Sequence, residues 1–184
     1  SRNRNPQFQK SHTVDLLIEN GYDVRIVDNL LDQVHHGKKP DYLNEKAEFI
    51  KADVSKLSSW KKFLENVGVI IHLASMAGIG QSMYETVDYC RSNIIGTANL
   101  YESLVKNQEL RKQIKKIIVA SSKTIYGEGA YNCKEHGLIF PDLRPLEQLQ
   151  KKDWELYCPK CLKVMETAPI PENKPDQSRS VYAV

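Results

Sequence analysis

The sequence contains no apolar run that approaches the length of a membrane span, and no secretory signal is visible at its N-terminus. It also has no strong excess of either charge, because its formal net charge is only +3. Cysteine is scarce, with four in 184 residues. Four cysteines without a signal indicate a reducing compartment, where thiols serve metals or redox chemistry rather than structural disulfides. We therefore expect a cytoplasmic protein that binds neither a membrane nor nucleic acid.

The residues that are present suit a folded domain. Hydrophobic residues make up 41% of the chain and charged residues 27%, which is ordinary for a globular protein and provides enough apolar material for a core. The length fits one domain, or one domain that carries a small insertion.

Short apolar segments alternate with helical patterns over the first two thirds of the chain. Alternation of this kind predicts βαβ units with a parallel sheet, in which ligands bind beyond the carboxyl ends of the strands. The segment 69–74 is almost continuously apolar, as expected of a strand buried on both faces. The predicted strands are 23–28, 47–53, 69–74 and 117–121.

Three helical patterns lie between and before these strands. Ser11 is predicted to cap a helix that carries Val14, Leu17 and Ile18 on one face. Ser55 is predicted to cap the next helix, whose apolar face consists of Trp60, Phe63, Leu64 and Val67. A later helix is predicted to bury a stripe formed by Ile94, Ala98, Tyr101 and Val105.

The regular pattern lapses between Tyr126 and Pro175. This stretch is rich in proline, contains three of the four cysteines and has few strand-like runs. It is interpreted as an irregular insertion rather than a continuation of the sheet.

Several short motifs, taken in order, resemble those of one family. They are Ser-His-Thr-Val-Asp-Leu-Leu (11–17), Val-Asp-Asn-Leu (27–30), Ala-Asp-Val (52–54), His-Leu-Ala-Ser (72–75), Asn-Ile-Ile-Gly-Thr (93–97), Ala-Ser-Ser-Lys-Thr-Ile-Tyr-Gly (120–127) and Ser-Val-Tyr-Ala-Val (180–184). Together they resemble the nucleotide-sugar epimerases and dehydratases of the extended short-chain dehydrogenase/reductase class. The resemblance implies a Rossmann-like doubly wound parallel sheet of the α/β class.

The resemblance also implies a set of residues that bind NAD. Asp28 would hold the adenosine ribose, and a carboxylate there favours NAD over NADP because a 2′-phosphate would be repelled. The alternative for Asp28 is a turn acid, and for Asp53 a simple helix entry. The implied cofactor-binding residues are Asp28, Asn29, Asp53, Val54, Leu73, Ala74, Ser75 and Asn93.

Ser122 and Tyr182 correspond to the reactive pair of this family. In the family, a tyrosinate takes a proton from a sugar hydroxyl while hydride passes to the nicotinamide, and the serine hydroxyl orders the same oxygen. A lysine four residues after the tyrosine lowers the pKa of the phenol, and the sequence stops before that position. The alternatives are a loop serine and a C-terminal tyrosine without a role.

The first residues depart from the family pattern. The family begins with a buried strand and Gly-x-x-Gly-x-x-Gly, whereas no glycine precedes Gly21 here. Residues 1–10 are also too polar for a strand buried on both faces. Without those glycines the backbone cannot approach a diphosphate closely, so we expect weak or no NAD binding.

The insertion contains a separate candidate site. Cys133 and His136 form a C-x2-H pair, and Cys158 and Cys161 form a C-x2-C pair. Three thiolates and one imidazole complete a tetrahedral structural zinc site with no open position. The alternatives are a redox C-x-x-C, which would lie at a helix N-terminus, and surface thiols beside an exposed histidine.

The remaining histidines and the fourth cysteine are assigned structural or solvated positions. His12 is expected on a helix face, and His35 and His36 in a solvated loop. His72 is expected to be structural, and Cys90 is expected to be a buried thiol.

These observations predict a divided chain. The expected parts are a polar leader (1–10), a partial Rossmann NAD-binding domain (11–126), a cysteine-containing zinc-knuckle insertion (127–178) and the start of the tyrosine helix (179–184). The resemblance implies a fragment, incomplete at both ends, of an enzyme that oxidises C4 of a nucleotide sugar, with impaired or no activity alone. The resemblance does not decide whether the reaction is epimerisation or dehydration. It also does not decide whether the chain forms a homodimer. The alternative is a non-catalytic Rossmann scaffold whose zinc site serves protein interaction.

Overall fold

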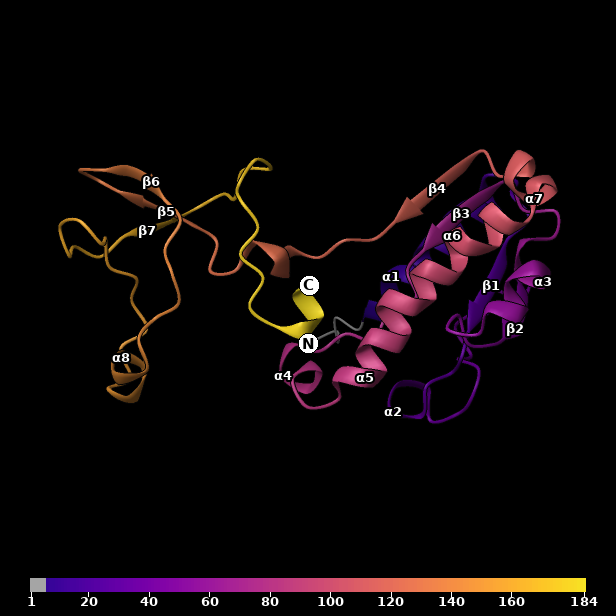
Figure 1. The fold of residues 1–184 in the computed structure, drawn as a ribbon, viewed down its shortest axis with the longest axis horizontal. Coiled ribbons are helices and arrows are strands. Elements are labelled where there is room, and N and C mark those ends of the chain that lie inside the picture. The colour runs from indigo at the N-terminus through magenta and orange to yellow at the C-terminus, as the bar shows by residue number, and fades with distance from the viewer. Residues whose placement is uncertain (1–5) are drawn as a thin grey trace. The chain divides into compact units, whose positions relative to one another are not determined.

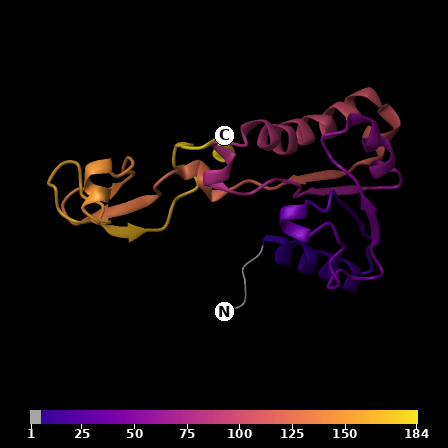
Figure 2. The ribbon, with the colours of Figure 1, turned by 90° about the horizontal axis from the view of Figure 1, so that it is seen from below.

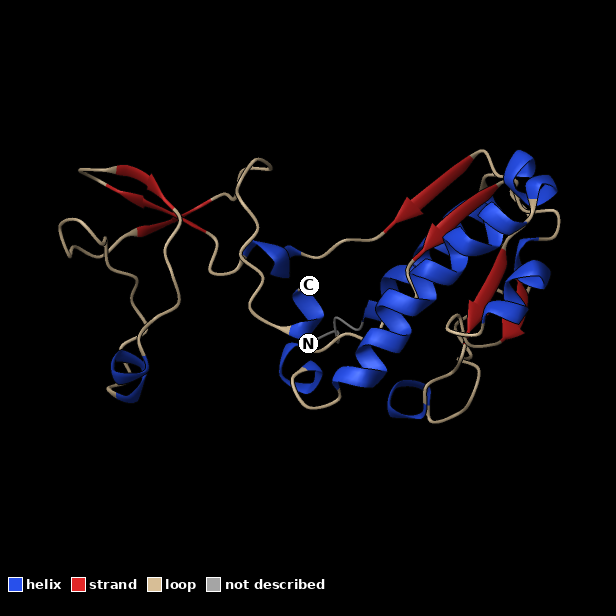
Figure 3. Cartoon of the chain, in the orientation of Figure 1, coloured by secondary structure: helices blue, strands red, loops and turns tan. Residues whose placement is uncertain are grey.

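The structure, a computed structural model, describes residues 6–184, with side chains from residue 11 onward. The chain divides into two compact units (Figures 1 and 3). Unit 1 comprises the residues up to Ala77 together with Glu85–Ala120, and unit 2 comprises Gly78–Tyr84 and Ser121–Val184. Among the described residues, no helix is long and apolar enough to cross a membrane.

Unit 1 contains four short strands in two parallel pairs. β1 (Arg25–Asp28) pairs with β2 (Glu48–Lys51), and β3 (Val69–His72) pairs with β4 (Lys116–Val119). The two pairs are separate two-stranded sheets. β1, β2 and β3 lie within the predicted segments, and β4 begins one residue before the predicted segment 117–121. The parallel α/β class is confirmed.

The N-terminal helix begins earlier than predicted. α1 spans Pro6–Glu19, so Ser11 lies inside this helix rather than capping it. Proline is tolerated in the first turn of a helix, where its missing N–H would have no intrahelical partner. In the described part of the chain no strand precedes β1. No described strand therefore joins the two pairs into the predicted single sheet.

Short helices connect the strands of unit 1. Lys56, not the predicted Ser55, precedes the first turn of the helical segment before β3, because the Ser55 N–H donates to Asp53 Oδ1 instead. The helical elements are α2 (Asp32–His35), η1 (Leu57–Ser59), α3 (Trp60–Leu64), α5 (Thr86–Tyr89), the π-helix η2 (Cys90–Ile95), α6 (Gly96–Lys106) and α7 (Gln108–Gln113).

One core cluster supports both strand pairs. Its buried members come from α3, α6 and α7, and partly buried side chains of all four strands pack against it. Figure 2 shows α6 and α1 on opposite sides of β3 and β4. The core residues are Trp60, Phe63, Leu64, Leu100, Leu104 and Leu110, with Val27, Ile50, Ile70 and Ile117 from the strands.

The predicted buried stripe on α6 is wrong. Ile94, Tyr101 and Val105 are exposed, whereas Leu100 and Leu104 enter the core. Asn99 is buried on the same side because its Nδ2 donates to the Val54 carbonyl. A polar residue that finds a partner can occupy a buried helix position, so the apolar spacing alone selected the wrong face.

The strands are less buried than predicted. Val69 on β3 and Ile118 and Val119 on β4 are exposed. Burial on both faces requires helices on both faces and strands on both sides. A two-stranded pair leaves part of each strand without such neighbours, so these side chains remain accessible.

Unit 2 is more regular than the predicted irregular insertion. β5 (Ala130–Cys133) lies between β6 (Gly137–Ile139) and β7 (Glu166–Ala168) in an antiparallel sheet of order β6-β5-β7. Such short, partly polar strands give little sequence signal. The other elements of this unit are α4 (Ile79–Ser82), η3 (Lys123–Tyr126), α8 (Leu146–Gln150) and η4 (Val181–Ala183).

Candidate functional site

Asp28 lies at the carboxyl end of β1, where the sequence predicts the ribose contact. Its Oδ1 accepts a hydrogen bond from the Leu30 N–H at 2.8 Å and lies 3.6 Å from His35 Nε2. His35 was predicted to be solvated, but only 9% of its side chain is exposed. Burial, together with the charge of Asp28, raises the pKa of Tyr42. The carboxylate therefore has the His35 imidazole as a neighbour, and the sequence pattern did not predict this contact.

The next three predicted cofactor residues take part in local packing. Asn29 is exposed, and its Oδ1 accepts from the Leu31 N–H. Asp53 Oδ1 accepts from the Ser55 N–H, which is the helix-entry turn considered as its alternative role. A Cβ on Gly96 would lie 2.7 Å from Val54 Cγ2. The Asn-x-x-Gly-Thr motif therefore needs glycine at that position so that Val54 can pack against the helix.

Asn93 is occupied by the backbone of the loop after β3. Its Oδ1 accepts from the Met76 N–H at 2.8 Å and its Nδ2 donates to the Met76 carbonyl at 3.0 Å. The loop contains Leu73, Ala74 and Ser75, the other predicted cofactor residues. Asn93 thus fixes the loop that leads away from the strand end, and its predicted contact with the cofactor stays a prediction.

His72 has the structural surroundings that were predicted for it. It is buried, its Nε2 lies 3.0 Å from Thr97 Oγ1, and its ring meets Trp60 edge to face. Thr97 Oγ1 also donates to the Asn93 carbonyl. Cys90, predicted to be buried, is instead partly exposed at the start of the π-helix η2.

Ser122 caps the turn η3 in unit 2. Its Oγ accepts from the Thr124 N–H at 3.3 Å and from Thr124 Oγ1 at 3.0 Å. Because the oxygen acts as the acceptor in both bonds, the hydroxyl hydrogen of Ser122 remains to be donated elsewhere.

Tyr182 lies in η4, a single turn of 3₁₀-helix. Its N–H donates to Ser82 Oγ at 3.1 Å, and the fully buried Ser82 hydroxyl donates in turn to the Ile79 carbonyl. The turn is capped by Ser180, whose Oγ accepts from the Ala183 N–H. η3 and η4 are in contact. The structure therefore brings together the turns that carry the two predicted catalytic residues.

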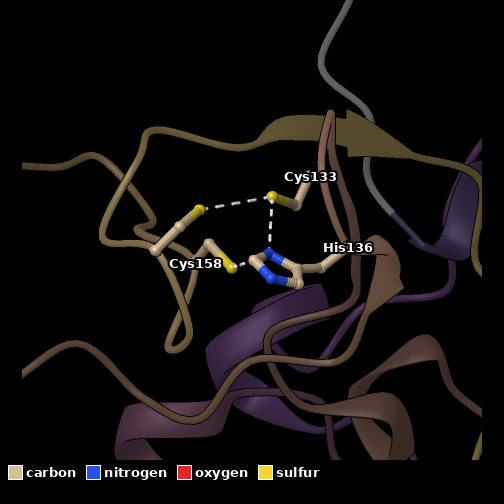
Figure 4. A group of neighbouring side chains, drawn as sticks. Cys133, His136 and Cys158 are labelled. Atoms are coloured by element: carbon tan, nitrogen blue, oxygen red, sulfur yellow. Dashed lines mark hydrogen bonds between the residues drawn. The ribbon is translucent and has the colours of Figure 1, made fainter.

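The predicted metal ligands converge in unit 2 (Figure 4). His136 Nδ1 lies 3.5 Å from Cys133 Sγ and 3.4 Å from Cys158 Sγ, and Cys133 Sγ lies 3.6 Å from Cys161 Sγ. The four ligand atoms all lie within 4.8 Å of one another. With Zn–S near 2.3 Å, a tetrahedral site has ligand–ligand edges of about 3.5–3.8 Å. Three of the edges, at 3.4–3.6 Å, are already within about 0.1 Å of this range.

Each ligand pair lies on a tight hairpin. Cys133 pairs with Gly137 across the turn between β5 and β6, where Gly137 has φ +69°. The second turn is closed by a bond from the Cys158 N–H to the Lys163 carbonyl, and Tyr157 bridges to Val164. No helix follows Cys158 within the described segment up to β7, which removes the feature that a redox C-x-x-C requires.

The environment of the thiols favours negative charge on Cys158. Burial opposes ionisation, but N–H groups of Cys161 and Lys160 and the thiols of Cys133 and Cys161 lower the pKa of Cys158 to about 6. The Lys163 N–H favours ionisation of Cys161, yet burial and the neighbouring sulfurs raise its pKa to about 11. Sulfurs this close cannot all ionise without a cation between them. A divalent metal ion among the sulfurs would offset the repulsion between their negative charges.

The family assignment follows from comparison with known sequences. Residues 10–146 match the profile of the NAD dependent epimerase/dehydratase family. The chain therefore belongs to this family, and the family predicted from the sequence is confirmed.

Two of the similar curated proteins are named as sugar-nucleotide 4-epimerases. A dTDP-L-rhamnose 4-epimerase of Burkholderia thailandensis is 34% identical over 133 residues, covering 71% of this chain and 36% of that protein. A putative UDP-glucose 4-epimerase of Methanocaldococcus jannaschii is 39% identical over 126 residues, covering 67% of this chain and 38% of that protein. The chain thus spans a little over a third of the length of these relatives.

Solved structures show the same fold. A UDP-glucose 4-epimerase of Thermotoga maritima, determined with UDP-glucose, is 26% identical and superimposes with a TM-score of 0.63. That match covers 94% of this chain and 42% of the epimerase. The Rossmann-like architecture is therefore shared with an epimerase structure about twice as long.

Proposed function

We propose that this chain forms the part of a nucleotide-sugar epimerase or dehydratase that carries the serine and tyrosine of C4 oxidation. The observation that carries the proposal is the contact between η3, capped by Ser122, and η4, which holds Tyr182. Membership of the family and similarity to 4-epimerases support the same reaction class. NAD, when bound, supplies the hydride acceptor for this chemistry.

The described residues suit the adenosine ribose of NAD but not its diphosphate. At the carboxyl end of β1, Asp28 accepts one backbone hydrogen bond through Oδ1, and a carboxylate there suits the hydroxyls of an adenosine ribose. The diphosphate would need backbone N–H groups at a glycine-rich turn before the first helix. Residues 6–19 are instead helical and glycine-free.

The side chains of unit 2 can orient and deprotonate a sugar hydroxyl. The Ser122 hydroxyl hydrogen is available because its oxygen accepts both bonds from Thr124. Tyr182 in its ionised form would accept the proton of the hydroxyl that Ser122 orders. Ser82 fixes the backbone of Tyr182 and so sets the position of that turn.

The test compares the 184-residue chain and the complete product of its gene with UDP-glucose, dTDP-L-rhamnose and UDP-N-acetylglucosamine. Formation of the 4-epimer or of the 4-keto-6-deoxy sugar is followed by NMR. We expect turnover in the complete product, and a loss of about 10²- to 10⁴-fold in Ser122→Ala and Tyr182→Phe. Tyr131→Phe, on β5, is the matched control. The absence of both products with every substrate would contradict the proposal.

We also propose that Cys133, His136, Cys158 and Cys161 bind one structural Zn²⁺ ion. Support comes from the three ligand–ligand distances of 3.4–3.6 Å and from the two hairpins that present the ligands. All four tetrahedral positions would be filled by protein, so the ion would stabilise the fold of the sheet rather than bind substrate.

A third proposal concerns the exposed apolar face of η2 and α6. Ile94, Tyr101 and Val105 are each about half exposed or more and recur at helical spacing, which suits pairing with a second copy of the chain. We expect Tyr101→Glu to convert a dimer to a monomer in sedimentation velocity, because a buried charge without a partner is costly. Gln108→Glu, on α7, should leave the dimer intact. A monomeric unsubstituted chain would contradict this proposal.

A further inference from the structure

The two turns of the candidate catalytic pair are distant in sequence. Ser122 and Tyr182 are separated by sixty positions, and β5, β6, α8 and β7 all lie between them in the chain. Bringing the ends of such a long segment together costs conformational entropy. Specific interactions near the point of closure must offset that cost if the turns are to keep a fixed relation.

Lys174 lies at this point of closure and is buried, with a relative exposure of 3%. Its Nζ donates to the Tyr126 carbonyl at 2.6 Å and to Gln177 Oε1 at 2.8 Å, with the Pro175 carbonyl at 3.5 Å. The ammonium also lies 5.2 Å from the centre of the Phe140 ring. The oxygens that accept these bonds are neutral, so the cation is held by hydrogen bonds and a ring face.

Burying the Lys174 ammonium costs desolvation free energy, which a specific interaction must offset. Desolvation lowers the pKa of Lys174, although the nearby Asp176 acts in the opposite direction. A hydrophobic residue would occupy the same space without that cost. Unlike an apolar side chain, the ammonium group of Lys174 can donate a hydrogen bond to the carbonyl of Tyr126, the last residue of η3.

Gln177 makes the second connection between the same two segments. Its N–H donates to the Ile125 carbonyl at 2.7 Å, while its side chain accepts from Lys174. The approach is close, because a Cβ on Gly127 would lie 2.9 Å from the Gln177 carbonyl oxygen. Gly127 also has φ +60°. The glycine after Tyr126 therefore allows the returning chain to lie directly against the serine turn.

We propose that Lys174 and Gln177 form a clamp that fixes the turn of Ser122 beside the turn of Tyr182, with Lys174 as a positioning residue for that pair. The proposal rests on the proposed function of Ser122 and Tyr182. The clamp acts on backbone carbonyls of η3, and five residues after Gln177 the chain reaches Tyr182. Neither clamp residue touches the reacting atoms.

The experiment measures amide hydrogen exchange by NMR in the zinc-loaded 184-residue chain and in Lys174→Met. The methionine fills a similar volume but donates no hydrogen bond. We expect exchange at the Gln177 and Tyr182 amides to accelerate by about tenfold to a hundredfold, which corresponds to loss of a hydrogen bond from a charged donor. The Cys158 and Met165 amides, which bond within the zinc-binding hairpins, should keep their protection. Lys151→Met, at an exposed position after α8, is the matched control.

The pattern of exchange separates positioning from general stability. Unchanged exchange at Gln177 and Tyr182, or an equal loss of protection at all four amides, would overturn the clamp. If Lys174→Met does not fold, Gly127→Ala replaces it, with Gly129→Ala as control because that glycine has φ +98° but no contact closer than 3.5 Å. Only Gly127→Ala should accelerate exchange at Gln177. Epimerase or dehydratase turnover of the unsubstituted protein is measured separately, so its absence would count against the proposed function and not against the clamp.

Discussion

Cys158→Ser should reduce bound zinc from about one equivalent to about one fifth of an equivalent or less in protein purified without added metal. Cys158 is fully buried, and its sulfur lies 3.4 Å from His136 Nδ1. A serine hydroxyl is a poor replacement for a thiolate in a tetrahedral structural site. Metal analysis by mass spectrometry measures the change.

Loss of zinc should also unfold the β6-β5-β7 sheet. The core of this sheet consists of Cys133, Leu156, Cys158 and Met165, so two of its four buried residues are proposed metal ligands. A core of that size cannot hold about forty residues in place, and small domains of this kind depend on metals or disulfides. Structural zinc contributes about 10–16 kcal/mol of binding free energy in small zinc domains, which far exceeds what Leu156 and Met165 provide. Amide exchange across β5 and β7 should therefore approach that of an unfolded chain.

The matched control for this prediction is Cys90→Ser. Cys90 is the fourth cysteine, lies in unit 1 and is absent from the cluster of candidate ligands. It should keep a full equivalent of zinc and the protection of the sheet. Less than about half an equivalent of zinc in the unsubstituted protein would rule out the metal site.

The cluster of candidate zinc ligands shows how much the sequence could predict about unit 2. The spacing of two ligand pairs was enough to predict that Cys133, His136, Cys158 and Cys161 would lie together, and the structure places their ligand atoms within 4.8 Å. The sheet that holds them was not predicted. Its strands have three or four residues, which is too short for a period-two pattern to stand out.

Helix faces were harder to predict than strands. The spacing of Ile94, Tyr101 and Val105 fits a buried stripe, but the neighbouring stripe with Leu100 and Leu104 faces the core. Both stripes fit the helical period, and only tertiary contacts decide which of them faces the core. Asn99 and Gly96 lie on the buried side because one bonds to the Val54 carbonyl and the other makes room for the Val54 side chain.

Interactions between distant polar residues gave no local signal. His35 follows Asp28 by seven residues, and nothing in the polar loop between them predicts that the imidazole is buried beside the carboxylate. Lys174 likewise lies in a proline-rich polar stretch that resembles an exposed linker. Both side chains acquire their roles from segments that meet only in the folded chain.

For the 184-residue chain we expect NAD binding weaker than a dissociation constant of about 1 mM, or −4.1 kcal/mol. In the described residues the first element is α1, the first glycine of the sequence is Gly21, and the pairs β1–β2 and β3–β4 are not joined. Asp28 keeps its predicted role towards the ribose, but in the described part of the chain no glycine-rich turn before the first helix offers backbone donors to the diphosphate. Calorimetric titration measures the affinity, and micromolar binding would contradict the prediction.

Replacing residues 1–10 by an apolar strand followed by Gly-x-x-Gly-x-x-Gly should tighten NAD binding by about a hundredfold or more, or at least 2.7 kcal/mol. The new strand can pair between β1 and β3, and the glycine turn brings N–H groups to the diphosphate at the start of the helix that then begins near Ser11. The same strand with its glycines changed to alanine restores the sheet without the close backbone approach. If this control binds NAD as tightly as the glycine version, affinity is limited by the lack of a strand between β1 and β3 in the described residues, and not by the lack of a glycine turn. If only the glycine version binds, and Asp28→Asn weakens it about tenfold, the ribose and diphosphate contacts act together in the way the family resemblance implies.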